Sequence, residues 1–373
     1  MNIAVNTKLL IKDRLEGIGW FEYETLSRIT RDHPEHQFFF IFDRPWDASF
    51  VFSDNVHPLR TFLPSRHPLL WYLRFHHIIP RLLKKHHIDL YVSPDGYNVP
   101  PPFRSLVAIH DLNYLHFPGN LPPLARKYYQ TFFPVYARNA NRLVTVSEYS
   151  KQDLVSSYGL DPERIDVVYN GAGKEFRPLS ESGKKMARDR YASGKPYFVF
   201  VGAINPRKNL GRLLQAFEVF CSRGESNVQL VIAGTHMFRN SFFQIDYESL
   251  SCRDRISFVG RLQREELAPL VGGAMSLLLP STFEGFGIPI IEAMYCDVPV
   301  ITSNTTAMPE VAGHAALYAD PYDVDSIADA MTKMASDAGL RKSLVEKGKR
   351  QREKYSWDAT AASLWASIEK SLP

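Results

Sequence analysis

The sequence predicts an α/β protein made of two doubly wound domains, and three observations lead to this. Short apolar runs of strand length alternate with helix-length segments along the whole chain. Such alternation is typical of a parallel sheet covered by helices on both faces. The scheme occurs once in each half, and a chain of 373 residues with 45% hydrophobic content can fill two cores.

In the first half, six apolar runs are expected to be strands and the segments between them helices. The predicted strands are residues 3–5, 38–42, 90–92, 106–109, 143–146 and 165–168, and the helices 20–30, 69–85, 123–139 and 151–158. Residues 177–195 are polar, lack apolar periodicity and include Pro178 and Gly194. We therefore predict a linker there, between domains 1–176 and 196–356.

The second half repeats the pattern. Its predicted strands are residues 197–201, 229–233, 256–259, 276–279 and 298–302, and its helices 210–221, 264–271, 289–295 and 324–335. Ligands of doubly wound sheets bind beyond the carboxyl ends of the strands. Two such domains facing each other predict a cleft for a small molecule.

Composition narrows the class of protein. A net charge of +4 is too weak to indicate a nucleic-acid partner. The three cysteines, at positions 221, 252 and 296, form neither a disulfide framework nor a metal-ligand pattern, so a cytoplasmic setting is expected. We expect neither a signal peptide nor a transmembrane helix, because no apolar run is long enough.

The strongest motif is residues 280–294, PSTFEGFGIPIIEAM, directly after a predicted strand. Gly285 and Gly287 let the backbone turn sharply, and Pro289 suits the start of a helix. A helix N-terminus at this point suits a phosphate. Glu284 and Glu292 could each accept hydrogen bonds from a vicinal diol, although a glutamate near a helix N-terminus is also favoured by the helix dipole alone.

This string resembles the E-x7-E signature of family 4 retaining glycosyltransferases, and residues 299–304 and 308–313 resemble the segments that come after the signature in that family. The resemblance implies the GT-B fold: two Rossmann-like domains, the second holding a nucleotide-sugar donor, and a final helix, 357–373, returning to the first. It also implies that Glu284 contacts donor-sugar hydroxyls and Glu292 the ribose. Backbone N–H groups of four residues would face the sugar and diphosphate: Gly285, Phe286, Gly287 and Ile288.

Residues 202–209, GAINPRKN, end another predicted strand after Val201 and begin with Gly202. Arg207 and Lys208 would face a diphosphate there, unless they are a surface basic pair before an asparagine helix cap. Lys208 matches a lysine of the family. Ala203 stands where the family commonly has a basic residue, so Arg207 is the candidate substitute. Residues 206–209 resemble a subset linked to mannose or rhamnose transfer.

Three weaker signals complete the predicted site. Gly17 and Gly19 look like the family's glycine-rich loop near acceptor and diphosphate, although a turn that starts a helix has the same pattern. His110 ends a strand and by resemblance approaches the donor sugar, although a lone histidine is usually structural. Gly260 and Arg261 end a strand that lies against the nucleobase in the family, although Arg261 could also be an ordinary residue at the approach to a helix.

Residues 55–88 contain no Asp or Glu, but six Lys or Arg and six His among several aromatics. A basic amphipathic helix of this kind can lie on an anionic membrane, which predicts peripheral membrane contact through 60–87. The alternative is a helix with a solvated basic face.

Together these features predict a retaining glycosyltransferase. It would move a hexose, with mannose favoured, from a nucleotide-diphosphate sugar to a saccharide or lipid-linked saccharide in cell-surface polysaccharide or lipopolysaccharide synthesis. GDP-mannose is the favoured donor, and UDP- or dTDP-sugars are alternatives. We expect no metal or other cofactor, because the one Asp-x-Asp sequence, residues 323–325, has the pattern of a helix cap. The open alternatives are a GT-B epimerase or hydrolase and a non-catalytic nucleotide-sugar-binding protein, with a NAD oxidoreductase disfavoured.

Overall fold

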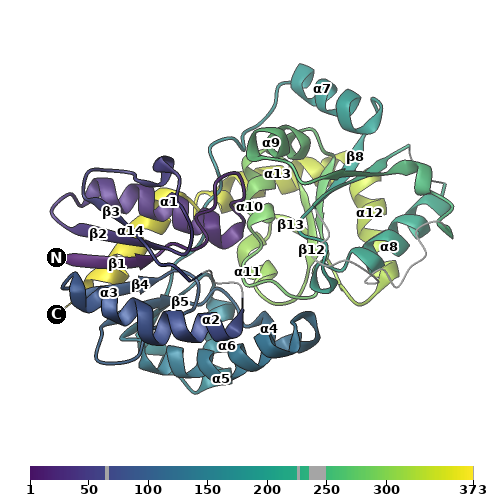
Figure 1. Cartoon of the computed structure of the whole chain (residues 1–373). Coiled ribbons are helices and arrows are strands. Elements are labelled where there is room, and N and C mark those ends of the chain that lie inside the picture. Colours follow the sequence, from purple (N-terminus) through teal and green to yellow (C-terminus); the bar gives the residue numbers. More distant parts are fainter. Residues whose placement is uncertain (64–66, 225–226, 235–248, 373) are drawn as a thin grey trace. The chain divides into compact units, whose positions relative to one another are not determined.

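The chain divides into two compact units in the computed structural model, which describes residues 1–63, 67–224, 227–234 and 249–372 (Figure 1). Unit 1 comprises Met1–Asn170 and Trp357–Pro373, and unit 2 comprises Gly171–Ser356. Among the described residues, no helix has both the length and the apolar character that crossing a bilayer requires.

Unit 1 is built on a seven-stranded parallel sheet in the order β3-β2-β1-β4-β5-β6-β7. Its strands are β1 (Asn2–Asn6), β2 (Gln37–Phe42), β3 (Val56–Arg60), β4 (Leu90–Ser93), β5 (Ser105–Ala108), β6 (Arg142–Thr145) and β7 (Ile165–Val167). The central strands are buried on both faces, which explains their nearly unbroken apolar sequences. The strand order reverses between β1 and β4, and these two strands pair directly.

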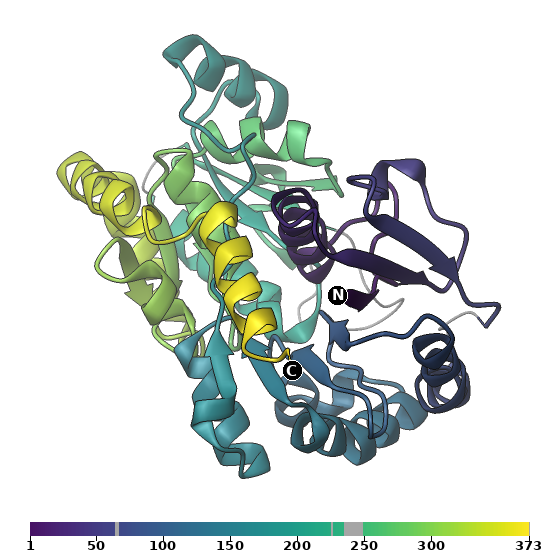
Figure 2. The ribbon, with the colours of Figure 1, turned by 90° about the vertical axis from the view of Figure 1, so that its left-hand side faces the viewer.

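Helices cover both faces of this sheet. They are α1 (Gly17–Asp32), α2 (Pro68–Leu73), the π-helical turn η2 (Arg74–Ile78), α3 (Ile79–Lys85), α4 (Asn113–His116), α5 (Pro123–Asn139), α6 (Glu148–Tyr158) and α14 (Trp357–Glu369). Helix α14 lies beside α1 (Figures 1 and 2), where the Trp365 ring stacks on the His33 ring with centroids 3.7 Å apart. Trp357, Leu364 and Trp365 thus complete the core of unit 1.

Unit 2 has a six-stranded parallel sheet in the order β10-β9-β8-β11-β12-β13. The strands are β8 (Tyr197–Val201), β9 (Gln229–Ala233), β10 (Ile256–Gly260), β11 (Ser276–Leu279), β12 (Val300–Ser303) and β13 (Ala316–Ala319). The helices are α7 (Glu181–Ala192), α8 (Leu210–Ser222), α9 (Arg264–Gly272), α10 (Ile288–Tyr295), α11 (Met308–Ala312), α12 (Val324–Ser336) and α13 (Ala338–Arg352). Here too the order reverses beside the first strand, between β8 and β11.

The predicted linker at residues 177–195 is wrong, because most of it is helix α7 within unit 2. The Ser180 hydroxyl accepts a hydrogen bond from the Gly183 amide and caps the helix, while Ala187 and Ala192 are buried and α7 packs on α9. A face made of small alanines gives almost no apolar periodicity. The first division of the units is instead at Asn170–Gly171, whereas the second, at Ser356–Trp357, is where the predicted returning helix begins.

Candidate active site

The candidate site of unit 2 lies at the carboxyl ends of β8 and β11, where the strand order reverses. Residues 202–209 leave β8 there, and residues 280–287 leave β11. This is the position where doubly wound sheets bind ligands. The two segments that carried the strongest sequence signals are therefore neighbours.

Glu284 is the centre of this site and contacts both predicted cations. Its Oε2 lies 2.7 Å from Arg207 Nη1, and its Oε1 lies 2.6 Å from Lys208 Nζ. The Ser281 hydroxyl donates a third hydrogen bond to Oε1 at 2.7 Å. Arg207 also donates to the Phe283 carbonyl at 3.0 Å. The basic pair is therefore held inside the site rather than displayed on the surface.

The charges of this cluster stabilise one another. Burial of Glu284 by itself favours the neutral acid, but the Arg207 and Lys208 charges and the hydrogen bonds outweigh it and lower the pKa of Glu284 to about 2. The carboxylate is consequently ionised at neutral pH. Two cations and one fixed anion leave a net positive site, which suits a diphosphate.

Local backbone geometry holds Arg207 and Lys208 in place. Asn205 caps the short 3₁₀ turn η5 (Pro206–Lys208) by accepting from the Lys208 amide, and Asn209 adopts a left-handed conformation with φ of 61°. The Asn209 side-chain amide donates to the carbonyls of Pro280 and Pro321 at 2.9 and 2.6 Å. Asn209 thus joins the segment after β8 to the segment after β11, a role that its sequence position did not reveal.

Two glycines allow the close packing of this edge. At Gly202 an added Cβ would lie 3.3 Å from Lys208 Cε, so the glycine leaves room for the Lys208 side chain to pass close to the backbone. At Gly234, after β9, a Cβ would lie 1.9 Å from the Gly202 carbonyl oxygen, which no side chain could tolerate. Gly234 was not among the predicted site residues. Its place directly after a strand was the available signal.

Helix α10 begins as the sequence indicated. Gly287 precedes it with φ of 94°, a conformation that favours glycine, and Pro289 stands in its first turn. The first N–H groups of a helix have no partner within the helix, so those of α10 are directed toward the segment that contains Gly285. The Phe286 ring is buried and packs edge-on against Tyr355, with centroids 5.6 Å apart, which fixes the turn.

Glu292 lies in the second turn of α10 and is 7% exposed. Burial disfavours its charged form, the nearby Arg264 and Lys208 charges favour it, and the Glu175 charge opposes it; the result is a pKa of about 7. The pKa values of Glu292 and Glu284 are thus shifted in opposite directions within the same unit. Glu292 differs from Glu284 in that it is buried without an ion pair to any of the residues that the structure describes.

Gly260 and Arg261 lie at the carboxyl end of β10, two strands away from β8. Gly260 has φ of 72°, and its carbonyl accepts a hydrogen bond from the Gly234 amide at 2.8 Å. The Arg261 side chain is exposed. These two residues therefore share the same edge of the sheet with the Glu284 cluster.

In unit 1, the predicted glycine-rich loop is the first turn of helix α1, which starts at Gly17. A Cβ at Gly17 would meet no atom within 4 Å, whereas one at Gly19 would lie 3.0 Å from the Leu9 carbonyl oxygen. Gly19 therefore lets α1 approach the segment that follows β1. The backbone at Gly17 and Gly19 has the form of a turn that starts a helix, which is the alternative that the sequence left open for this segment.

His110 follows β5 and has a defined tautomer. Its Nε2 lies 2.8 Å from the Pro94 carbonyl oxygen, which can only accept, so Nε2 carries the proton and Nδ1 is an acceptor. Burial lowers the pKa of His110, so the ring is neutral, and it packs edge-on against Phe21. Asp111 accepts from the Asn113 amide at 3.0 Å and caps the next turn.

A buried polar cluster where β1 and β4 end was missed by sequence reasoning. The Lys8 Nζ lies 2.9 Å from Asp95 Oδ2 and 3.5 Å from the centroid of the Tyr97 ring. Asn6 and Ser93 donate to Asp95 Oδ1 at 2.8 and 3.0 Å. Lys8 and Asp95 come just after the two strands that flank the reversal of unit 1, which was the available signal.

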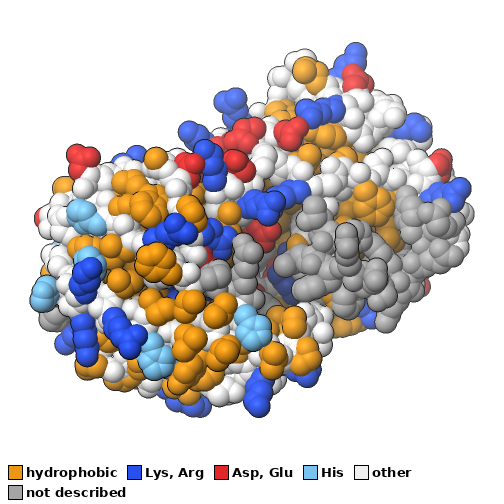
Figure 3. Space-filling model, viewed as in Figure 1, with side chains coloured by type: hydrophobic (Ala, Val, Ile, Leu, Met, Phe, Trp, Pro, Cys, Tyr) orange, Lys and Arg blue, Asp and Glu red, His pale blue; other side chains and the backbone are white. Residues whose placement is uncertain are grey.

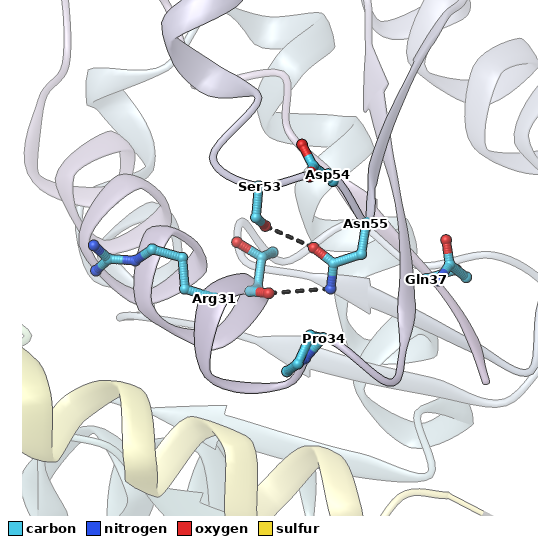
Figure 4. A pocket seen from close by; sticks show the side chains of 7 residues that line it. Arg31, Pro34, Gln37, Ser53, Asp54 and Asn55 are labelled. Carbon is cyan, nitrogen blue, oxygen red and sulfur yellow. Dashed lines mark hydrogen bonds between the residues drawn. The ribbon is translucent and has the colours of Figure 1, made fainter.

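A separate pocket in unit 1, lined by Arg31, Asp54 and Asn55 among others, lies at the opposite, amino edge of the sheet (Figure 4). The Asn55 amide group donates to the carbonyls of Thr30, His33 and His36, so it closes the surrounding turns. Elsewhere in the described part of the chain, no three His, Cys, Asp or Glu side chains are grouped to hold a metal ion.

Comparison with known proteins relates both halves of the chain to sugar transferases. Residues 27–175 match the model described as Glycosyltransferase Family 4, and residues 183–351 match that described as Glycosyl transferases group 1. O-antigen chain mannosyltransferase B of Escherichia coli is 28% identical over 256 residues, which are 68% of this chain and 67% of that protein. The MMP alpha-(1->4)-mannosyltransferase of Mycolicibacterium hassiacum is 30% identical over 258 residues, which are 67% of this chain and 59% of that protein.

Solved structures share the fold over nearly the full length. HepE from Anabaena, in complex with UDP-glucose, superposes with a TM-score of 0.77 at 15% identity and covers 99% of this chain and 100% of its own. WaaG, a glycosyltransferase involved in lipopolysaccharide biosynthesis, gives 0.74 at 15% identity, with 98% of both chains covered. At such identities the likeness shows the fold alone.

The fold and the two family matches define the chain as a glycosyltransferase with the GT-B fold. It belongs to the family 4 group of these enzymes, with the Family 4 domain in its first half and the group 1 domain in its second.

Proposed function

We propose that the enzyme transfers a mannose-type hexose, with retention of anomeric configuration, from a nucleotide-diphosphate sugar to a hydroxyl of a saccharide or lipid-linked saccharide. The observation that carries this proposal is Glu284 held between Arg207 and Lys208 where β8 and β11 end. A donor diphosphate there would meet two cations and the N-terminus of α10. Glu284 would accept hydrogen bonds from sugar hydroxyls and Glu292 from the ribose.

The preference for mannose rests on the relatives. Proteins similar to this chain include O-antigen chain mannosyltransferases of Escherichia coli and Salmonella typhimurium, which supports a role in cell-surface polysaccharide synthesis. GDP-mannose is accordingly the favoured donor. HepE binds UDP-glucose, so UDP-sugars, together with dTDP-sugars, are the competing candidates.

The chemistry proposed for the chain is electrostatic. As the bond between sugar and diphosphate breaks, negative charge grows on the departing phosphate, and Arg207, Lys208 and the α10 N-terminus stabilise it. His110, neutral and with Nδ1 as acceptor, would take a hydrogen bond from a sugar hydroxyl. We propose Gly260 and Arg261 as neighbours of the nucleobase, and Gly17 and Gly19 as the backbone that faces acceptor and diphosphate.

Donor binding is tested by thermal shift with GDP-mannose, UDP-glucose, dTDP-rhamnose and NAD, because a ligand of the native state raises the melting temperature. One sugar nucleotide should stabilise the wild type, and Glu292→Ala should weaken the effect. Glu265→Ala, on the exposed side of α9, is the matched control. An equal rise of the melting temperature in wild type and Glu292→Ala, or a rise with NAD alone, would refute the donor site. Product analysis with a saccharide acceptor separates transfer from epimerisation and hydrolysis.

A second proposal concerns location: the enzyme works at the cytoplasmic face of a membrane, in peripheral contact through residues 60–87, of which 64–66 lie outside the described residues. Phe62 is 92% and Leu69 60% exposed, and the basic side chains of Arg81, Lys84 and Lys85 are exposed nearby in sequence. Figure 3 shows hydrophobic, basic and histidine side chains intermingled over unit 1. Anionic lipids would attract this mixture.

Vesicle co-sedimentation tests this second proposal. Wild type should bind vesicles that contain anionic lipid, and Phe62→Ser combined with Leu69→Ser should reduce binding. Met186→Ser, which removes a similarly exposed side chain from unit 2, should leave binding unchanged. Equal binding by all three proteins would refute membrane contact through this segment.

A further inference from the structure

The buried cluster where β1 and β4 end has the same construction as the candidate site of unit 2. In each sheet, the first strand of the unit pairs with the fourth at the reversal of the strand order. In unit 2, Lys208 comes after β8 and contacts Glu284, which comes after β11, at 2.6 Å. In unit 1, Lys8 comes after β1 and contacts Asp95, which comes after β4, at 2.9 Å. The same pair of charges therefore lies at equivalent places in the two sheets.

The groups around Asp95 also repeat those around Glu284. Ser93 donates to Asp95 Oδ1 at 3.0 Å, as a serine donates to Glu284 in unit 2. A second cation is present in unit 1 as well, because Arg74 Nη2 lies 3.4 Å from Asn6 Oδ1, and Asn6 Nδ2 donates to Asp95 Oδ1 at 2.8 Å. Each cluster therefore combines an arginine, a lysine, a serine and one carboxylate.

The two lysine–carboxylate pairs reach solvent to a similar, small extent. The side chains of Lys8 and Asp95 are 11% and 2% exposed, compared with 10% and 6% for Lys208 and Glu284. Burial lowers the pKa of Lys8, whereas the Asp95 charge raises it, and the Tyr97 ring, 3.5 Å from Nζ, also favours the ammonium. Lys8 is thus as accessible as the lysine that is proposed to hold the donor diphosphate.

Packing and pairing within unit 1 do not account for this cluster. Burying two cations with one carboxylate costs free energy. Two further acids do not compensate, because Asp43 is paired with Arg44 at 2.6 Å and burial raises the pKa of Glu22 well above its usual value. The Thr7 hydroxyl, next to Lys8 in the chain, is buried without a hydrogen-bond partner among the described residues. The strand end therefore has the polar, positively charged character of a binding site for an anion.

We propose that Lys8 and Asp95 form the saccharide-binding site of unit 1, and that its ligand is an acceptor with a phosphate ester beside a sugar hydroxyl. Lys8 has three N–H donors and would give one to a phosphate oxygen. A carboxylate has about four acceptor positions, and Asp95 accepts from three groups, so one sugar hydroxyl can be added. This inference rests on the proposed transferase function, because it assigns the chemical class of the acceptor.

Tryptophan fluorescence can measure binding to unit 1 separately. All five tryptophans lie in that unit, and the Trp71 ring packs edge-on against the Tyr97 ring with centroids 5.9 Å apart. The full chain is titrated with the 6-phosphates of mannose, glucose and N-acetylglucosamine, with a short-chain alkyl mannosyl diphosphate, and with methyl α-mannoside as the neutral control. At least one phosphorylated compound should bind about tenfold more tightly than methyl α-mannoside, because only the phosphate forms a charge-assisted hydrogen bond.

The preferred titrant also distinguishes two sources of the phosphate. Tighter binding of a 6-phosphate would identify a free sugar phosphate as the acceptor. Tighter binding of the alkyl mannosyl diphosphate would identify a lipid-linked saccharide. Both results support the site, since both ligands present a phosphate beside a hydroxyl.

Substitutions locate the ligand within the chain. Lys8→Met should weaken binding of the phosphorylated compound about tenfold, whereas Lys208→Met, the matched change in unit 2, should leave it unchanged. Asp95→Asn should bind inorganic phosphate at least as tightly as the wild type, because the carboxylate no longer competes for Lys8. Asp95→Asn also serves as the deciding variant if far-UV circular dichroism shows that Lys8→Met does not fold.

Three results would overturn the inference: no fluorescence response to any phosphorylated compound, equal affinity for methyl α-mannoside, or a loss of binding in Lys208→Met but not in Lys8→Met. Weaker phosphate binding in both Lys8→Met and Asp95→Asn would show a structural role instead. The thermal shift with nucleotide sugars tests unit 2 independently. If a nucleotide sugar stabilises wild type and Lys8→Met alike while no sugar phosphate binds, the site in unit 1 fails and the donor site stands.

Discussion

Replacing Glu284 by glutamine tests how strongly the ion cluster stabilises unit 2. The substitution keeps the shape and removes the charge that faces Arg207 and Lys208. The pKa of Glu284 falls from its usual 4.5 to about 2, and each unit of pKa corresponds to about 1.4 kcal/mol. Because Glu284 is almost fully buried, solvent screens this little, so Glu284→Gln should lower the stability of unit 2 by about 3 kcal/mol at neutral pH.

The sign of the pH dependence comes from the lowered pKa. The stabilisation is complete above the unfolded value of about 4.5 and is lost as pH falls through about 2, so near pH 3 the difference should shrink to about 1.4 kcal/mol. Urea unfolding followed by far-UV circular dichroism measures it. All five tryptophans lie in unit 1, so their fluorescence reports that unit separately and should not change. A loss that is independent of pH, or under 1 kcal/mol at neutral pH, would refute the reasoning.

Substitutions at His110, Trp365 and Gly287 have defined outcomes. His110→Asn should retain more transferase activity than His110→Gln, by about tenfold in kcat/KM. The reason is that asparagine places an acceptor near the position of Nδ1, whereas glutamine places one near that of Nε2. The reverse order of activities would mean that Nε2 contacts the substrate. Trp365→Ala should destabilise unit 1 by about 3–5 kcal/mol in urea unfolding, since the ring is buried against His33. Gly287→Ala should lower the stability of unit 2 by about 1–2 kcal/mol because of its positive φ, whereas Gly339→Ala in α13 should not.

The sequence predicted the site best where one continuous string carries it. Gly287, Pro289 and Glu292 lie on one turn and one helix, so residue type and spacing were sufficient. The contact between Glu284 and the Arg207–Lys208 pair joins residues 76 or 77 positions apart, and it depends on β8 pairing with β11. Parallel-strand order is a property of the whole sheet, and local periodicity contains no information about it.

The fold class was predicted correctly, but two strands at the edges of the sheets were missed. Strands β3 and β13 went unrecognised because β3 contains Pro58 and both are short edge strands of mixed composition. The buried pair of Lys8 and Asp95 escaped notice because each, alone, has the sequence context of an ordinary loop residue. Their ion pair can be recognised only once the strand order is known, because the pairing of β1 with β4 brings the two residues together.

The placement of α14 also determines the order in which the protein can be completed on the ribosome. The core of unit 1 requires Trp357, Leu364 and Trp365, which are synthesised after all of unit 2. Residues 1–170 therefore emerge first but wait with an uncovered apolar face beside α1, while unit 2 has every segment it needs as soon as residue 356 has left the tunnel. The domain that begins the chain is the last to be finished, so a nascent chain stalled before residue 357 would expose a surface for chaperones or proteases.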